Sequence, residues 1–369
     1  MSVIFCSPIP PTLDLMKQLI LVVSILIAAP SILLAQKPNT QFNGFGHVEY
    51  ALDYTDHADS YFILGEHDFF LTSKLSDKIS FLGEYVIRFN SGSATTFLPS
   101  IERSFVKFNY KNNHSLIFGK IHTPLNYWND VYHHGRLFFP TIDRPSAFSY
   151  FVPLHMLGLQ AQGQNLGPLN FGYDVVVGNG IASTDVFDDN VDPAFAVAVH
   201  IKPKEGYRIG ASYYFDHMAT NTYSAHTGHS ASKRHYVGPL YKGMMHFSLA
   251  SFSYAQFTDK VEILNEFSYN RTFTDSLGAA NNIANYLYAG IRIKDKHVPY
   301  FKTEYMNVSK SDLHTYPVRI QKIALGYKHE FSPMVNVKFQ LERYNYSHHN
   351  VGSALPNSTA LEVQLSYGF

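Results

Sequence analysis

The chain ends with N-S-T-A-L-E-V-Q-L-S-Y-G-F, from Asn357 to Phe369. Every second residue from Leu361 to Phe369 is apolar or aromatic, and the positions between them hold Glu, Gln, Ser and Gly. This period of two predicts a strand with one apolar face and one wet face. A soluble protein would leave such a terminal strand as an edge prone to aggregation. A barrel instead pairs its last strand with its first, so we expect a closed barrel.

The same ending, with Tyr367 before a final Phe369, resembles the last strand of Gram-negative outer-membrane β-barrels of the porin type. The resemblance implies an outer-membrane location and contact with outer-membrane lipid. It also implies that the barrel-assembly machinery recognises the C-terminal strand. The motif is short, so the rest of the chain must show a matching pattern.

The N-terminal residues predict an export signal. From Met16 the chain reads M-K-Q-L-I-L-V-V-S-I-L-I-A-A-P-S-I-L-L-A-Q, with one Lys, an apolar core and the small residue Ala35 near its end. These features are typical of a signal peptide; a membrane-anchoring helix is the alternative, for which the stretch is barely long enough. We expect residues 1–35 to be the signal peptide, with Met1 an over-called upstream start, and residues 36–369 to form the barrel. The one cysteine, Cys6, lies in the upstream piece, so no disulfide is expected.

The composition fits alternating lipid-facing and water-facing positions. Aromatic residues make up 15% of the chain and charged residues 16%, compared with about 25% charged in soluble domains. Mean hydropathy is only −0.12. After the N-terminal segment, no apolar run approaches the roughly 18 residues of a membrane-spanning helix. The zero formal net charge argues against a nucleic-acid partner.

Period-two segments occupy most of the remaining chain. Sixteen of them begin near Gln41, Ser60, Asp77, Pro99, His114, Pro153, Pro168, Asp192, Gly206, Met244, Asp259, Ala284, Val298, Val318, Met334 and Asn357. Segments of about 10–15 residues can cross the hydrocarbon layer at a tilt. We therefore predict an all-β fold, a single transmembrane antiparallel β-barrel of about sixteen strands. The segment from Met244 to Gln256 is the most poorly patterned. A barrel of this strand number encloses an aqueous channel.

The connections between these segments alternate in length. The tight set is 76–77, 111–113, 165–167, 204–205, 258–259, 295–296 and 332–333. The intervening set is 55–59, 90–98, 122–152, 180–191, 218–243, 274–283, 309–317 and 347–356. Its members are longer, except for the first, 55–59, which is short. Outer-membrane barrels have short periplasmic turns and longer external loops. We therefore expect the intervening set to lie on the external side.

The third and longest external connection, His122–Val152, is the candidate constriction. In general porins, which this chain resembles in the position and length of the loop, the third loop folds into the lumen and narrows the channel. Its aromatic residues suit packing, and its prolines would stiffen it. If the loop folds inward, these side chains would line the constriction: Asp130, His133, His134, Arg136, Asp143 and Arg144. The alternative is an external cap whose charges pair with one another.

Charged side chains on the wet face of the strands are expected to line the pore. They are Glu84, Arg88, Arg103, Lys107, Lys120, Arg208, Arg292, Lys302, Lys322 and Lys338. Segregation of opposite charges onto separate walls would set a transverse field across the lumen. A mixed arrangement would instead form neutralising cross-strand pairs. The sequence leaves both arrangements open.

Motifs of metal sites and enzymes are absent from the sequence. It contains no H-E-x-x-H element, nucleophile elbow or phosphate-binding loop. We therefore predict no catalytic residue, no cofactor and no metal site. The adjacent pairs His133-His134 and His348-His349 are expected to be solvated loop histidines, because neighbouring histidines rarely reach one ion together.

The predicted function is that of an outer-membrane porin, which allows passive diffusion of small hydrophilic solutes or ions, rather than that of an enzyme. The porin resemblance implies a homotrimer. The runs R-S-F-V-K from Arg103 and F-G-K up to Lys120 are faintly similar to phosphate-selective porins. Two alternatives stay open: a barrel enzyme of the protease, lipase or deacylase type, and a non-conducting structural or secretion-associated barrel.

Overall fold

The computed structural model describes residues 39–54, 58–89, 97–133, 135–182, 187–219, 243–315, 317–348 and 357–369. The expected signal peptide, His134 and His349 lie outside these residues. The described strands are β1 (Thr40–Tyr54), β2 (Ala58–Lys74), β3 (Ile79–Phe89), β4 (Phe97–Lys111), β5 (His114–His122), β6 (His155–Leu166), β7 (Phe171–Gly178), β8 (Ala194–Ile201), β9 (Tyr207–Met218), β10 (Met245–Phe257), β11 (Val261–Thr274), β12 (Gly278–Ile291), β13 (His297–Asn307), β14 (Val318–Ser332), β15 (Val335–His348) and β16 (Ser358–Gly368). Two short helical turns, η1 (Trp128–Tyr132) and α2 (Ser146–Tyr150), lie between β5 and β6. Among the described residues, no helix is long and apolar enough to span a bilayer.

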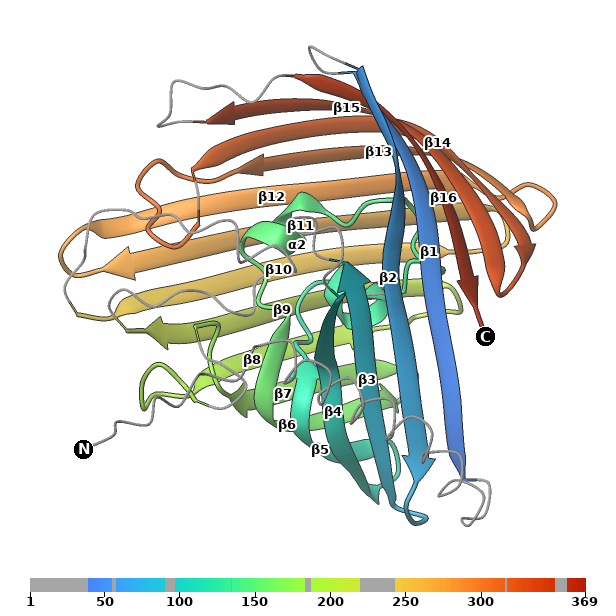
Figure 1. The fold of residues 1–369 in the computed structure, drawn as a ribbon. Coiled ribbons are helices and arrows are strands. Elements are labelled where there is room, and N and C mark those ends of the chain that lie inside the picture. Colours follow the sequence, from blue (N-terminus) through green and yellow to red (C-terminus); the bar gives the residue numbers. More distant parts are fainter. Residues whose placement is uncertain are drawn as a thin grey trace, which may run out of the picture.

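The strands form one closed antiparallel barrel, as the sequence predicts. Each strand pairs with its neighbours in sequence, and β1 pairs with β16, where Phe45 lies opposite Gly368 and Leu52 opposite Leu361. The blue first strand and the red last strand lie side by side in Figure 1. Closure gives the backbone groups of the terminal strands internal partners, which a strand in lipid requires.

Side chains alternate between the two faces of the wall with the predicted parity. In β15, Lys338 and Glu342 are fully buried on the inner face, whereas Phe339 and Leu341 are 42% and 49% exposed on the outer face. In β16, Gln364 is likewise buried and Leu365 exposed. The barrel therefore carries its polar side chains inside and an apolar surface outside, the arrangement that a lipid environment favours.

The predicted start of β12 is wrong by six residues. The strand begins at Gly278 rather than Ala284, so the connection after β11 is a tight turn, residues 275–277, and not a long loop. The run from Gly278 to Asn282 shows no apolar alternation, which hid this part of the strand. Asn282 is nevertheless fixed on the inner face, where its amide donates to Asn270 Oδ1 (2.7 Å) and to Asp312 Oδ2 (2.8 Å).

The weak patterning of β10 has a structural reason. Its inner face carries Met245, Phe247 and Leu249, all buried. The Phe247 ring packs against Tyr214 of β9 and His314 of the connection after β13, with ring centroids 5.9 and 5.1 Å apart. Part of the lumen is therefore filled with apolar side chains, which removes the contrast between inner and outer faces on which the sequence pattern depends.

A close approach of β5, β6 and β7 positions the start of the inner loop. Gly119 and Gly158 lie opposite each other, and Gly158 also pairs with Gly178. A Cβ atom at Gly158 would lie 2.1 Å from the carbonyl oxygen of Val177, so only glycine fits there. Just beyond this row, β5 ends at His122 and β6 begins at His155.

Candidate functional site

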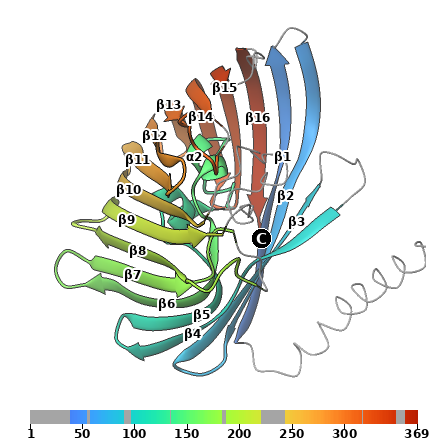
Figure 2. The ribbon, with the colours of Figure 1, turned by 90° about the vertical axis from the view of Figure 1, so that its left-hand side faces the viewer.

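The connection between β5 and β6, residues 123–154, which we name the inner loop, lies inside the barrel. The backbone N–H of Trp128 donates to Glu266 of β11 (3.1 Å). Both the backbone N–H and the hydroxyl of Ser146 donate to Glu304 Oε2 of β13, each at 2.7 Å. In Figure 2, α2 of this loop lies on the concave side of β10–β14. Backbone groups of the loop thus bind carboxylates on the inner face of the wall.

Aromatic packing holds the loop in place. Trp128 and Phe139 are almost completely buried, and their ring centroids lie 5.0 Å apart. Trp128 also packs edge-on against Tyr286 of β12 at 5.2 Å. Burial of one large apolar side chain stabilises by roughly 1.5–3 kcal/mol, so this pair contributes substantially to docking of the loop. Phe138, another aromatic residue of this loop, is instead 56% exposed.

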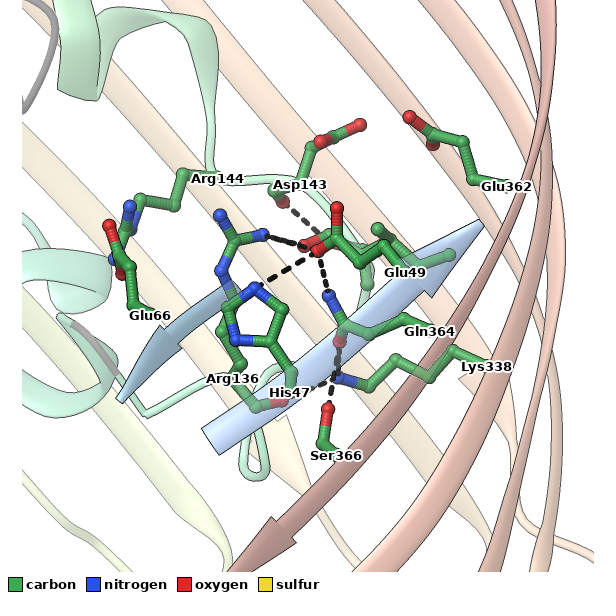
Figure 3. Close-up of polar contacts among 12 residues, drawn as sticks. His47, Glu49, Glu66, Arg136, Asp143, Arg144, Lys338, Glu362, Gln364 and Ser366 are labelled. Carbon is green, nitrogen blue, oxygen red and sulfur yellow. Dashed lines mark hydrogen bonds and ion pairs between the residues drawn. The ribbon is translucent and has the colours of Figure 1, made fainter. Parts of the chain in front are cut away.

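Ion pairs join the loop to β1 and β2 (Figure 3). Arg144 Nη2 lies 2.9 Å from Glu66 Oε2 of β2, and Arg136 Nη1 lies 3.7 Å from Glu49 Oε1 of β1. Both guanidinium groups also lie over the Phe139 ring, 5.5 Å for Arg136 and 5.6 Å for Arg144. Each arginine therefore combines a carboxylate partner with a cation–π contact.

Lys338 of β15 also binds the inner loop. Its Nζ donates to the carbonyl oxygen of Arg136 at 2.5 Å and to Gln364 Oε1 at 2.9 Å. The Gln364 amide in turn donates to Glu49 Oε1 at 2.6 Å, as Figure 3 shows. Strands β1, β15 and β16 thus share one polar network with the inner loop.

A polar space of about 350 Å³ remains between the inner loop and the wall. It is lined by Glu66, Arg136, Asp143, Arg144, Ser146, Phe148, Ser149, Tyr150, Ile320, Lys322, Tyr344 and Tyr346. The loop contributes one side of this space, and β2, β14 and β15 contribute the rest. Charged groups of both signs therefore face the same gap.

Solved structures with a similar fold are outer-membrane proteins. The anion-selective porin from Comamonas acidovorans has a TM-score of 0.62 at 12% identity, covering 89% of this chain and 99% of that chain. The outer membrane channel DcaP of Acinetobacter baumannii has a TM-score of 0.58 at 12% identity, covering 89% and 97%. The trimer form of in-vitro folded OmpT, an outer membrane protein of Vibrio cholerae, has 0.57 at 12%, covering 89% and 99%. The chain has the porin fold. No family model and no curated protein matches its sequence.

The described residues among those predicted to form the constriction of this porin-fold barrel lie in three places. Arg136, Asp143 and Arg144 line the polar space together. Asp130 lies elsewhere, paired with Arg208 of β9. His133 is only 3% exposed, so the expectation that it is a solvated or lining residue is wrong, because it packs against other histidines beneath the loop.

The predicted pore-lining charges form mixed pairs rather than segregated walls. Arg103 pairs with Glu84, Arg88 with Glu102, Arg208 with Asp130, and Arg292 with Glu262 and Glu330. Lys322 lies over the Tyr344 ring at 5.1 Å, and Lys107 lines a second space of about 560 Å³ at the tight-turn end. Among these described charges, the neutralising arrangement therefore prevails over a transverse field.

Three further lysines belong to the predicted pore-lining set: Lys120, Lys302 and Lys338. Lys302 and Lys338 point into the barrel but are fully buried, because the inner loop covers them, so they do not contact lumen water. Lys302 Nζ lies 2.6 Å from Glu342 Oε1. Lys120 pairs in register with Ser104 and Leu157, one residue beyond Gly119, and its assignment to the pore stays a prediction.

Electrostatics keep Asp143 charged. Burial alone would raise the pKa of this carboxyl, but Lys302, Lys322 and Arg136 outweigh burial and lower its pKa to about 2. Asp143, Glu342 and Glu362 also place one carboxylate oxygen each within 4.8 Å of one another. The ammonium group of Lys302, which lies 4.0 Å from Asp143, already supplies a cation to this acidic group.

Several contacts of the site were missed from the sequence. Glu49 lies on the predicted wet face of its strand, but nothing local shows that it binds Arg136 of the loop. Likewise, nothing local in the sequence shows that Glu66 binds Arg144 or that Glu304 binds Ser146. For Glu49, which lies opposite Gln364 and Ile63, the signal is an acidic side chain on an inner face without a basic cross-strand neighbour, since a loop cation then has to neutralise it. Glu304 lies opposite Lys322 and gives no such signal.

Proposed function

We propose that the protein is an outer-membrane channel of the porin type, through which small hydrophilic solutes or ions diffuse passively. One observation carries this proposal: a polar gap lined by Arg136, Asp143, Arg144 and Lys322 remains between the inner loop and the wall of a sixteen-stranded barrel. Barrels of this size enclose water rather than a packed side-chain core. In this proposal, residues 123–154 form the constriction and the outer membrane of a Gram-negative bacterium is the site of action.

The proposal includes three partners: outer-membrane lipid, the barrel-assembly machinery and further copies of the chain. The exposed apolar outer face, including Phe339, Leu341 and Leu365, would contact outer-membrane lipid. The C-terminal strand would engage the barrel-assembly machinery. The trimer form of OmpT supports a homotrimer, which chemical cross-linking in detergent would reveal as a three-fold band.

Conductance in planar bilayers tests the proposal against both alternatives, the barrel enzyme and the non-conducting barrel. We expect defined open-channel steps from the folded protein, and larger steps from Arg144→Ala, because the guanidinium faces the gap. Asp77→Ala, at an exposed tight turn, is the matched control and should leave the steps unchanged. A silent barrel that has folded correctly would overturn the proposal.

A further inference from the structure

Three histidines from separate segments meet beneath the inner loop. His122 is the last residue of β5 and His155 the first of β6, and the two lie opposite each other in register. His133 reaches them from the loop, with its ring centroid 3.4 Å from that of His122 and 4.9 Å from that of His155. Each of the three offers one ring nitrogen within 4.8 Å of the others. Three imidazoles brought together in this way are a common protein ligand set for zinc.

Asn129 fixes the orientation of the His133 ring. Its amide nitrogen donates to the carbonyl oxygens of Thr123 (2.9 Å) and Leu154 (3.2 Å), so its oxygen is left as the acceptor for His133 Nδ1 at 2.7 Å. His133 Nδ1 must therefore carry the proton, which leaves the Nε2 lone pair to act as a ligand. Such a hydrogen bond to the second ring nitrogen is the usual means of orienting a metal-binding histidine.

A carboxylate lies close to a ring nitrogen of each of the other two histidines, His155 and His122. Glu102 Oε2 lies 3.0 Å from His155 Nε2, and Glu84 Oε2 lies 3.6 Å from His122 Nε2. Both carboxylates are themselves held by arginines, Arg88 and Arg103. A carboxylate next to a histidine ligand orients the ring and raises its basicity, or fills a fourth coordination position.

The backbone of His133 is also constrained. Its φ angle is 40°, in the left-handed region that a residue with a Cβ rarely adopts. Residues persist in such conformations where the surroundings fix them, and they concentrate at functional sites. Its carbonyl oxygen accepts a hydrogen bond from Arg144 Nε at 3.0 Å, which links the histidine group to the residues that line the polar gap.

We propose that His122, His133 and His155 bind one divalent transition-metal ion of the zinc class, which ties the inner loop to the β5–β6 wall. Glu102 or a water molecule would complete a tetrahedral set. The rings of His122 and His133 are stacked at an interplanar angle of 27°, so ligation requires one of them to turn until the ion lies in the plane of both. Sequence motifs do not show this site, because its ligands come from two strands and a loop.

Metal content of the refolded full chain tests the proposal. After chelation and dialysis against micromolar zinc, we expect one zinc per folded chain by elemental mass spectrometry. His122→Ala, His133→Ala and His155→Ala should each abolish stoichiometric binding. Asn129→Ala should weaken it by about 10–100-fold, the range measured for lost outer-shell partners. His47→Ala is the matched control, because His47 is also buried inside the barrel and lies on β1.

Cobalt substitution separates a built site from adventitious binding to the chain's 19 histidines. Cobalt(II) in the wild-type protein should give the intense visible bands of a tetrahedral nitrogen-ligated ion, and a chelator should remove them. Electrophoretic mobility of unheated samples reports whether each variant folds. Any of three results would overturn the proposal: a folded wild type that binds no zinc, zinc binding as stoichiometric in all three histidine variants as in the wild type, or an octahedral cobalt spectrum. If the alanine variants fail to fold, the wild-type cobalt spectrum alone decides.

Discussion

Arg144 of the inner loop lies 2.9 Å from Glu66 of β2, while Ser146, two residues later, is bound to Glu304 of β13. Strands β1, β16, β15 and β14 separate β2 from β13 around the barrel. A short piece of loop therefore spans from one part of the wall to another. This bridging arrangement explains how an irregular segment is held inside a lumen without a strand of its own.

Removal of the Glu66 carboxylate should loosen this bridge. Glu66→Gln leaves the guanidinium of Arg144 largely buried beside a neutral amide, and a charged hydrogen bond of this kind contributes about 1.5–3 kcal/mol. We expect a lower free energy of unfolding in denaturant titrations and noisier open-channel current. A double-mutant cycle with Arg144→Ala should show coupling between the two side chains. Additive effects would mean that the pair does not hold the loop.

Reversal of one charge in the gap should change ion selectivity. Lys322 lines the polar space, so Lys322→Glu should shift the reversal potential in a salt gradient towards cation preference. The matched control is Lys204→Glu in the exposed turn after β8. Equal shifts in the two variants would show that Lys322 does not act at the narrow part of the channel.

A charged side chain on the outer face should destabilise the folded barrel. Leu341 lies near the middle of β15 and is 49% exposed on the apolar side. Leu341→Arg is expected to destabilise the folded barrel in lipid vesicles by about 2–4 kcal/mol, as arginine does at a bilayer midplane. Asp77→Arg at a tight turn serves as the control. A neutral effect of Leu341→Arg would show that this face does not meet lipid.

The low pKa of Asp143 predicts a specific pH dependence. Because the folded-state pKa of about 2 lies below the ordinary value of 3.8, the ionised carboxylate stabilises the folded state at pH above about 4. This contribution is lost as the pH falls from about 4 through 2. Wild type and Asp143→Asn should therefore differ in free energy of unfolding at pH 5–7 and converge near pH 2. A difference that stays constant across this range would contradict the assignment.

Most of the fold could be predicted from local sequence patterns. The alternation in the last strand and in segments such as Val335–Glu342 predicts which side chains lie on the outer face of the barrel, and turn residues mark the tight connections. The pattern failed where the environment on the two faces becomes similar. The first residues of β12 are small or polar on both faces, and the inner face of β10 is apolar because Phe247 packs inside the lumen.

The site was only partly predictable. Arg136, Asp143 and Arg144 could be chosen because they are charged residues of one long loop. Their partners Glu49 and Glu66 could not, since the contacts depend on the path of the loop across the lumen. Histidines 122, 133 and 155 meet for the same reason: strand register and loop course, not spacing in the sequence, bring them together.

Thiol blockade of the gap is the most direct test of a channel narrowed by the inner loop. Ser149 lines the polar space, and the chain's one cysteine, Cys6, lies in the expected signal peptide. Ser149→Cys in residues 36–369 should conduct in planar bilayers, and a bulky methanethiosulfonate reagent should then reduce the single-channel conductance in discrete steps. Leu341→Cys on the outer face is the control and should show no such reduction. Mass spectrometry would verify that the reagent has modified Ser149→Cys. If the conductance is unchanged after verified modification, the result contradicts the proposed channel.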